Sequence, residues 1–193
     1  MSSTLPSPTR VVLSNDPIRP SDGKRYDEPG VEVAVHTLEP EPVFGGILKR
    51  VTIGTHAAVP TTNDGPMHLD AVPGAGVVLP GGANIYYLDF APDSEVPMHR
   101  TTSTDYVIIV EGTLTVLSPT GPFNVVDGKG TYQVSETVCR AGDVVTQRGS
   151  MHAWANRTDK WVRLICVVLA ASPARVDVEG EGETKQFEER WLQ

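Results

Sequence analysis

Short runs of apolar and β-branched residues, separated by turn-forming residues, recur along most of the chain. Such runs cover residues 31–36, 47–55, 84–90, 105–110, 113–117, 132–139, 143–147, 151–156 and 161–170. Their length and their content of Val, Ile, Thr and aromatic residues favour strands over helices. Many short strands with regular turn signals predict an all-β barrel or sandwich.

Turn residues between these runs predict how the strands connect. Glu111-Gly112 separates residues 105–110 from 113–117, which predicts a tight hairpin. Residues 132–139 are expected to pair with that hairpin. Residues 59–76 form a long, turn-rich loop whose role the sequence does not define.

The two ends of the chain differ in composition from its middle. Residues 1–30 are rich in Pro, Ser and Asp and predict an irregular arm, pinned down by the sequence RVVL. Residues 31–175 form the predicted barrel. Residues 176–193 are expected to be an acidic link followed by a short helix, because Phe187 and Trp191 are spaced four apart.

Composition narrows the possible partners and compartment. The 193 residues suit one core, and the net charge of -8 without a basic cluster argues against nucleic acid and anionic membranes as partners. No run of 18 apolar residues predicts a membrane span, and the start lacks a signal-peptide core, so we expect a cytoplasmic protein. Cys139 and Cys166 are expected to be buried apolar residues rather than a disulfide.

Candidate chemistry is concentrated in two segments. The first contains His99, Asp105 and Gly112, and the second runs from Gly142-Asp143 through Gly149, His152, Trp154 and Asn156. Side chains two apart in a strand share a face, which places His99 with Thr101 and His152 with Trp154. A barrel in which these side chains point inward has a few polar groups in an apolar wall, which is typical of a small-molecule pocket.

These segments resemble the two motifs of the cupin superfamily over roughly residues 84–170. His99 matches the first histidine of the family's His-x-His pair, and Asp105 stands at the glutamate position with the six-residue spacing to Gly112 kept. The second segment matches at Gly142-Asp143, Gly149, His152 and Asn156. The chain looks most like small single-domain cupins of secondary-metabolite pathways, several of which are called oxidoreductases. The resemblance implies a double-stranded β-helix, or jelly-roll, barrel.

Two departures from the family pattern leave the metal question open. Thr101 replaces the second histidine, and the glutamate is shortened to Asp105. His99, Asp105 and His152 remain as a possible triad for one divalent ion, such as Fe, Mn or Zn. Alternatively Asp105 pairs with Arg100, and the pocket holds no metal.

The remaining site candidates are assigned to the pocket wall. Trp154 shares the face of His152, while Gln147 either reaches the pocket mouth or fixes the turn before that histidine. Asn156 is expected to stabilise a turn. The residues expected to contact substrate are Arg100, Thr101, Trp154, Gln147, Val107 and Ile109.

Three functions remain open at this point. The first is a tailoring enzyme in which His99 and His152 act as general acid and base on a hydrophobic carbonyl or carboxylate metabolite, such as a polyketide intermediate. Asp105 would stabilise the imidazolium, and the reaction would be a decarboxylation, dehydration or isomerisation. The alternatives are a metal-dependent oxidoreductase or dioxygenase, and a non-catalytic ligand-binding protein. Cupins often dimerise through sheet edges and an exchanged arm, so we expect a homodimer.

Overall fold

The structure, a computed structural model, describes residues 5–15, 31–58, 70–71, 76–178 and 183–193. Within these ranges the chain is almost entirely β-structure, with one 3₁₀ turn, η1 (Phe44–Gly46). The described part of the chain contains no helix long and apolar enough to cross a membrane. The predicted loop at residues 59–76 lies almost wholly outside the described residues.

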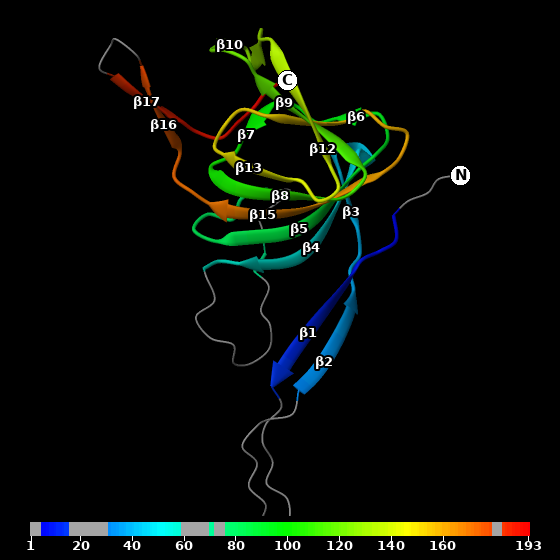
Figure 1. The fold of residues 1–193 in the computed structure, drawn as a ribbon. Helices are drawn as coiled ribbons and strands as arrows, with labels where there is room; N and C mark the ends of the chain where they lie inside the picture. The colour runs from blue at the N-terminus through cyan, green and yellow to red at the C-terminus, as the bar shows by residue number, and fades with distance from the viewer. Residues whose placement is uncertain (1–4, 16–30, 59–69, 72–75, 179–182) are drawn as a thin grey trace, which may run out of the picture.

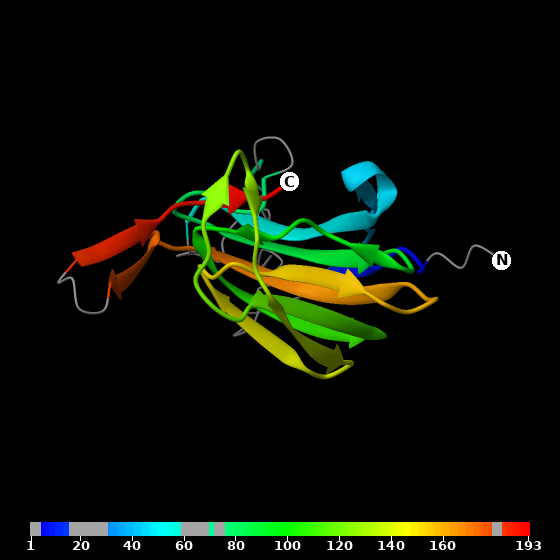
Figure 2. The ribbon, with the colours of Figure 1, turned by 90° about the horizontal axis from the view of Figure 1, so that it is seen from above.

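Two antiparallel sheets form the body of the protein (Figures 1 and 2). The larger sheet has six strands in the order β13 (Val144–Arg148), β8 (Ser103–Glu111), β15 (Val162–Ala170), β5 (Ala83–Phe90), β4 (Leu48–His56) and β3 (Glu41–Val43). The smaller sheet has the order β12 (Val134–Arg140), β9 (Thr113–Pro119), β14 (Ala153–Asn156) and β6 (Ser94–Glu95). The two sheets enclose the main apolar core, which confirms the predicted cupin-type barrel.

Period-two alternation along the strands creates the inner wall of this barrel. Tyr86, Leu88 and Phe90 of β5 face inward, as do Leu164 and Cys166 of β15. Both sulfhydryls of the chain are buried and free, as predicted. The inward positions of β5 and β15 therefore form much of the core.

The predicted hairpin at Glu111-Gly112 is wrong. Strand β8 pairs with β13 and β15, whereas β9 pairs with β12 and β14, so the chain turns a corner between the two sheets at Gly112. Gly112 has a φ of +88°, and a Cβ added there would lie 2.9 Å from Val162 Cγ2. A hairpin turn and a corner between sheets both need a residue that adopts a positive φ, and glycine does so most easily. The sequence pattern therefore did not distinguish them. The predicted pairing of residues 132–139 with β9 is confirmed.

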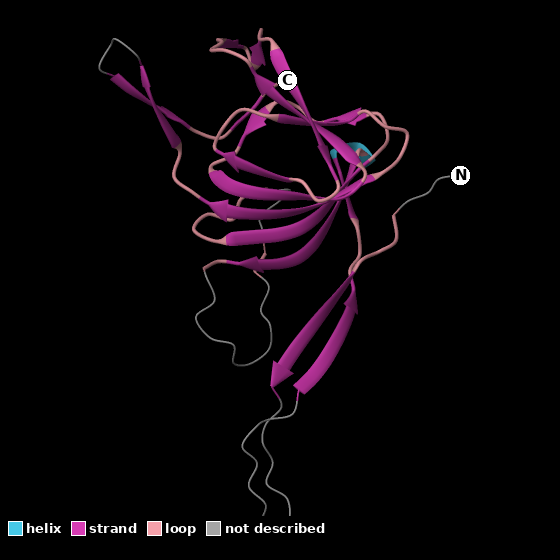
Figure 3. Ribbon diagram, viewed as in Figure 1, coloured by secondary structure: helices cyan, strands magenta, loops and turns pink. Residues whose placement is uncertain are grey.

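The predicted C-terminal helix is also wrong. Strand β17 (Glu183–Phe187) pairs with β16 (Ala174–Val178), and β18 (Arg190–Trp191) pairs with β7 (His99–Arg100) (Figures 1 and 3). A further short pair is formed by β10 (Val125–Val126) and β11 (Lys129–Gly130). The backbone N–H of Leu192 donates to the Met98 carbonyl, and its side chain is buried. Backbone pairing to β7 therefore overrides the helical spacing of the two aromatic residues.

Part of the predicted irregular arm is a strand. The RVVL sequence lies in β1 (Thr9–Asn15), which pairs along its whole length with β2 (Val31–Thr37). The arm is also fixed to the barrel, because Arg163 Nη2 donates to the Pro6 carbonyl at 3.0 Å. Figure 1 shows the β1–β2 hairpin projecting away from the barrel.

This hairpin predicts a homodimer, and we propose that a second copy covers it. Isolated two-stranded sheets are marginally stable in water, and Val33 and Val35 of β2 are 59% and 63% exposed. Light scattering after size exclusion should give twice the chain mass at micromolar concentration. The double substitution Val33→Lys/Val35→Lys should give a monomer of unchanged fold. Val126→Lys, at an equally exposed valine on β10, should remain dimeric, and a monomeric wild type would contradict the proposal.

Asn156 predicts a local requirement for the barrel. Its side-chain amide donates to the carbonyls of Phe90, Ala91 and Lys160, and its Oδ1 accepts from the backbone N–H and hydroxyl of Thr158, which confirms the expected turn-stabilising role. Replacing Asn156 by Ala leaves these buried groups unpaired and should lower the free energy of unfolding by about 2 to 4 kcal/mol in urea.

The neighbouring Arg157→Ala is the matched control for this prediction. Its ion pairs with Glu95 and Glu136 are half-exposed, so the loss should stay within about 1 kcal/mol. Equal effects of the two substitutions would show that the Asn156 network adds no special stability.

Candidate active site

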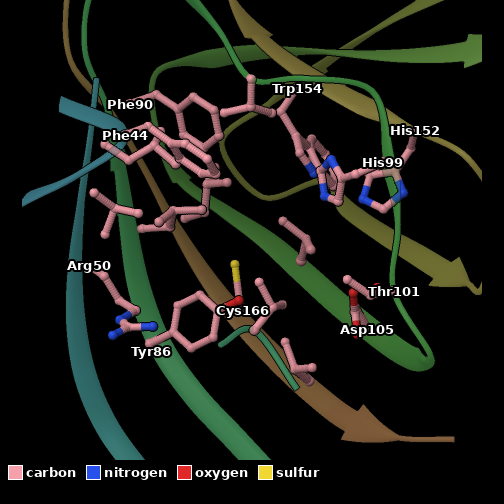
Figure 4. A pocket seen from close by; sticks show the side chains of 18 of the residues that line it. Phe44, Arg50, Tyr86, Phe90, His99, Thr101, Asp105, His152, Trp154 and Cys166 are labelled. Carbon is pink, nitrogen blue, oxygen red and sulfur yellow. The ribbon is translucent and has the colours of Figure 1, made fainter. Parts of the chain in front are cut away.

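A cavity of about 210 Å³ lies inside the barrel between the two sheets (Figure 4). Its wall is mostly apolar, with polar groups on two sides. The described residues that line it are Val43, Phe44, Leu48, Arg50, Val77, Tyr86, Leu88, Phe90, Val96, His99, Thr101, Asp105, Val107, His152, Trp154, Leu164, Cys166, Val168 and Trp191.

His99 and His152 meet in this wall. The two residues exchange both backbone hydrogen bonds, each N–H donating to the other's carbonyl at 2.8 Å. Residues paired in this way have neighbouring side chains, and the ring centroids lie 4.4 Å apart. Both side chains are buried. The two motifs, 53 positions apart in sequence, are thus joined by one antiparallel bridge.

The backbone also fixes the tautomer of each ring. His99 Nδ1 lies 2.8 Å from the Pro97 carbonyl oxygen, and His152 Nδ1 lies 3.0 Å from the Ser150 carbonyl oxygen. A carbonyl oxygen only accepts hydrogen bonds, so each Nδ1 carries the proton and donates it. In the neutral ring Nε2 then holds the lone pair. Each histidine reaches the cavity with a basic nitrogen that has no hydrogen bond to any described residue.

Burial keeps both rings neutral. It lowers the pKa of His99, and it lowers the pKa of His152 to about 4, assisted by repulsion from His99. The carbonyls of Pro97 and Ser150 oppose these shifts only in part. Asp105 is not among the groups that shift either pKa, so the predicted stabilisation of the imidazolium by this carboxylate is not seen.

Asp105 instead belongs to a buried polar cluster of its own. Gln147 Nε2 donates to Asp105 Oδ2 at 3.2 Å and to Thr101 Oγ1 at 2.8 Å, and Ser103 Oγ also donates to Thr101 Oγ1. Asp105 Oδ1 is buried and has no hydrogen-bond partner among the described residues. Burial raises the pKa of Asp105 to about 6, although Ser103, Gln147 and Thr101 act in the opposite direction. The site therefore holds a carboxyl group that exchanges its proton close to neutral pH.

The predicted metal triad is not assembled. Across the described ranges, no three His, Cys, Asp or Glu side chains are grouped closely enough to hold a metal ion. Aspartate is one methylene shorter than the glutamate of the family pattern, and its carboxylate is bonded to Gln147. Figure 4 shows Asp105 beside Thr101, apart from the two imidazoles. The residues present do not fit the three-ligand site, so no step of the proposed chemistry uses a metal.

The other predicted site residues divide into three groups. Thr101, Val107 and Trp154 line the cavity, and Trp154 meets His152 edge-on at 5.5 Å between ring centroids. Gln147 lies behind the wall, where its Oε1 accepts from the backbone N–H groups of Gly149 and Ser150, so it fixes the turn and also holds Asp105. Ile109 is in the core and does not line the cavity.

Arg100 points away from the cavity. Its Nε donates to the Glu188 carbonyl at 2.9 Å, and its guanidinium lies over the ring of Phe187. Neighbouring residues of a strand face opposite sides, so the burial of His99 sends Arg100 outward. Arg100 is therefore not among the described residues that line the cavity, and the alternative pairing with Asp105 is not seen.

Trp191, Arg50 and Tyr86 are among the lining residues that the sequence analysis missed. Trp191 stacks on His99, with ring centroids 4.0 Å apart and planes 2° from parallel. Its pairing with β7 had no local signal in the sequence. Arg50 and Tyr86 lie on β4 and β5, where a single Arg inside an apolar run and the alternation of residues 84–90 could have indicated inward positions.

Comparisons with known proteins agree with this fold and these motifs. No protein-family model matches the chain. Phomopsin biosynthesis cluster protein D of Diaporthe leptostromiformis is 33% identical over 103 residues, which are 53% of this chain and 48% of that protein. A cupin-domain-containing oxidoreductase of Neurospora crassa is 32% identical over 108 residues, which are 52% of this chain and 45% of that protein. The chain therefore spans about half the length of the curated relatives it matches.

Among solved structures, the Drosophila melanogaster CENP-C cupin domain matches 68% of this chain and 74% of its own, with a TM-score of 0.42 and 16% identity. A likeness of this size carries no functional argument. The sequence relatives confirm the resemblance to cupin-domain proteins and to proteins of biosynthesis clusters that the two motifs predicted.

Burial of Asp105 predicts a pH-dependent loss of stability. Its pKa rises from an ordinary 3.8 to about 6 on folding, so the folded state holds more protons than the unfolded state between these values. Raising the pH through this window should therefore lower the free energy of unfolding of the wild type relative to Asp105→Asn, by about 3 kcal/mol, with no further change above it. His152 is common to both proteins, so its opposite pH dependence cancels.

Urea denaturation at a series of pH values measures this difference. Asp159→Asn, at an exposed carboxylate, is the matched control and should leave the pH dependence of the wild type unchanged. Parallel curves for the wild type and Asp105→Asn would show that Asp105 is not buried in its charged form.

Proposed function

We propose that this protein is a tailoring enzyme that moves protons on a hydrophobic carbonyl or carboxylate metabolite, such as a polyketide intermediate. The reaction class is decarboxylation, dehydration or isomerisation. The observation that carries the proposal is the pair of buried, neutral imidazoles, 4.4 Å apart, each with its Nδ1–H donated to a carbonyl and its Nε2 free.

A neutral Nε2 in an apolar cavity is suited to act as a base. It accepts a proton from a carbon next to a carbonyl, and the resulting imidazolium donates that proton to another atom of the same substrate. The second imidazole is close enough to share in this exchange. Only one ring of the pair carries the proton at a time, because repulsion disfavours two imidazolium groups at this distance.

Asp105 supplies a second proton-transfer group, and it holds its proton to a higher pH than His152 does. Its pKa of about 6 lies above the pKa of about 4 of His152, so carboxylic acid and neutral imidazole coexist between these two pH values. Two titratable groups whose environments move their pKa values in opposite directions are typical of acid–base sites. In the proposed reaction the carboxyl donates to a leaving hydroxyl or a carbonyl oxygen, while an imidazole accepts from carbon.

The wall and the relatives support the substrate class. Phe90, Val96, Val107 and Leu164 surround the polar groups, which favours an apolar body on the substrate. Relatives are named as proteins of the phomopsin and oryzines biosynthesis clusters, which supports a role in the biosynthesis of a metabolite.

A redox reaction is the second candidate, because several relatives are named as cupin-domain-containing oxidoreductases. Oxygen consumption by protein purified without chelator, with its metal content measured in parallel, distinguishes this candidate. A third possibility, a non-catalytic ligand-binding protein, would show binding without turnover.

Hydrogen–deuterium exchange tests the main proposal without a known substrate. In D₂O, wild-type protein should introduce deuterium next to the carbonyl of medium-chain ketones and β-keto acids, followed by NMR. His99→Gln and His152→Gln should each slow this exchange by about 10²- to 10⁴-fold. If the two rings work as one unit, the double variant should be hardly slower than either single variant.

His36→Gln is the matched control, since His36 is exposed on β2. It should exchange at the wild-type rate. Thermal melts confirm that each variant is folded. A folded His152→Gln protein with the wild-type rate would rule out the catalytic role of the pair.

A further inference from the structure

The cavity carries one cation that proton transfer does not use. Arg50 lies on β4 with its side chain facing the same way as Leu48, two positions earlier. It is the only Lys or Arg among the described lining residues, and its side chain is 16% exposed. A guanidinium in such an apolar surrounding is costly unless an anion or a set of acceptors compensates it.

The described acceptors compensate Arg50 only in part. Nη1 donates to the Gly76 carbonyl at 3.2 Å, and Nη2 lies 3.5 Å from the carboxylate of Glu41, which is 68% exposed. The Nε atom is buried and has no hydrogen-bond partner in the described part of the chain. The guanidinium thus keeps donor capacity at the cavity wall, and a carboxylate is the group that a guanidinium binds best.

Tyr86 is close enough to contribute to the same site. It lies on the neighbouring strand β5, where it pairs with Thr52, and its side chain lines the cavity. Burial raises the pKa of the Tyr86 hydroxyl, Cys166 and Asp105 act in the same direction, and the charge of Arg50 lowers it. This hydroxyl makes no hydrogen bond to a described residue, so it is available as a neutral donor to an anion held by Arg50.

The proton-transfer groups lie on the other side of the cavity. Figure 4 shows Arg50 and Tyr86 on one side, the two imidazoles and Asp105 on the other, and Cys166 between them. Arg50 is not among the groups that shift the pKa of Asp105, so these opposite charges do not pair across the lumen. The polar groups of the cavity therefore fall into two sets on opposite sides, and the charge of Asp105 still reaches Tyr86 and raises its pKa.

We propose that Arg50 and Tyr86 form an anion-binding subsite, and that the substrate is an amphiphilic carboxylate whose carboxylate binds there. This inference rests on the proposed function only for which end of the substrate reacts. The carboxylate is an anchor and stays on the product, because it is held away from the imidazoles. The bound carboxylate is therefore not the group that a decarboxylation would remove. The carbonyl that undergoes proton transfer lies at the other end of the apolar body.

Calorimetric binding of straight-chain carboxylates tests the subsite directly. Hexanoate, octanoate and decanoate are the probes, with octanamide as the neutral partner of octanoate. The tightest-binding carboxylate should bind Arg50→Gln about 10- to 100-fold more weakly than the wild type. Octanamide should bind both proteins alike. Arg50→Lys, which keeps the charge but loses the planar donor array, should be intermediate.

Two further variants locate the anion. Glu41→Gln removes the other partner of the Arg50 charge and should bind the carboxylate as tightly as the wild type or more tightly. His152→Gln should bind it like the wild type. The proposal is overturned if no carboxylate binds the wild type, if Arg50→Gln binds it equally well, if octanamide loses as much affinity, or if His152→Gln is the variant that loses it.

These results also separate the subsite from the proposed function. If only the subsite is wrong, deuterium exchange on neutral ketones still depends on His152. If only the proton-transfer function is wrong, octanoate still binds through Arg50 and no exchange occurs in any variant.

Discussion

The site depends on one constraint, the burial of two imidazoles whose Nδ1 atoms are tied to backbone carbonyls. Water is excluded from the rings, which lowers both pKa values and keeps the rings uncharged. The carbonyls of Pro97 and Ser150 then decide which nitrogen holds the proton. Chemistry at the free Nε2 atoms follows from these two conditions, and neither condition requires a third ligand or a charge partner.

The barrel supplies these conditions through its topology. The His99–His152 bridge joins β7, which precedes β8, to the residue directly before β14. The same backbone pairing that helps to close the barrel therefore brings the two imidazoles together. The C-terminal segment completes the wall, because β18 pairs with β7 and places Trp191 flat on His99. Pairing of the C-terminal segment therefore also shapes the wall beside His99.

The sequence predicted the fold and the imidazole pair well, because both depend on local patterns. Strand alternation and motif spacing identified the barrel, and His99, Thr101, Asp105, His152 and Trp154 all line the cavity. The errors have non-local causes. The corner at Gly112 and a hairpin make the same local demands, and the last segment has an i, i+4 pattern that a helix would also show. Only pairing with distant strands distinguishes the alternatives in each case.

Side-chain roles were harder to predict than positions. Sequence placed Asp105 beside Arg100 or beside the histidines, whereas the structure gives it to Gln147 and Thr101. Such a choice depends on an ångström or two of side-chain reach, which spacing does not encode. Arg50 and Tyr86 lie on strands outside both motifs, so the motif pair gave no reason to select them.

Nitrogen NMR of protein labelled with ¹⁵N in histidine tests the central claim most directly. Near neutral pH the account predicts two rings, assigned to His99 and His152 by substitution, that are uncharged, protonated at Nδ1 and unprotonated at Nε2. An imidazolium, or a proton on Nε2 of either ring, would contradict it.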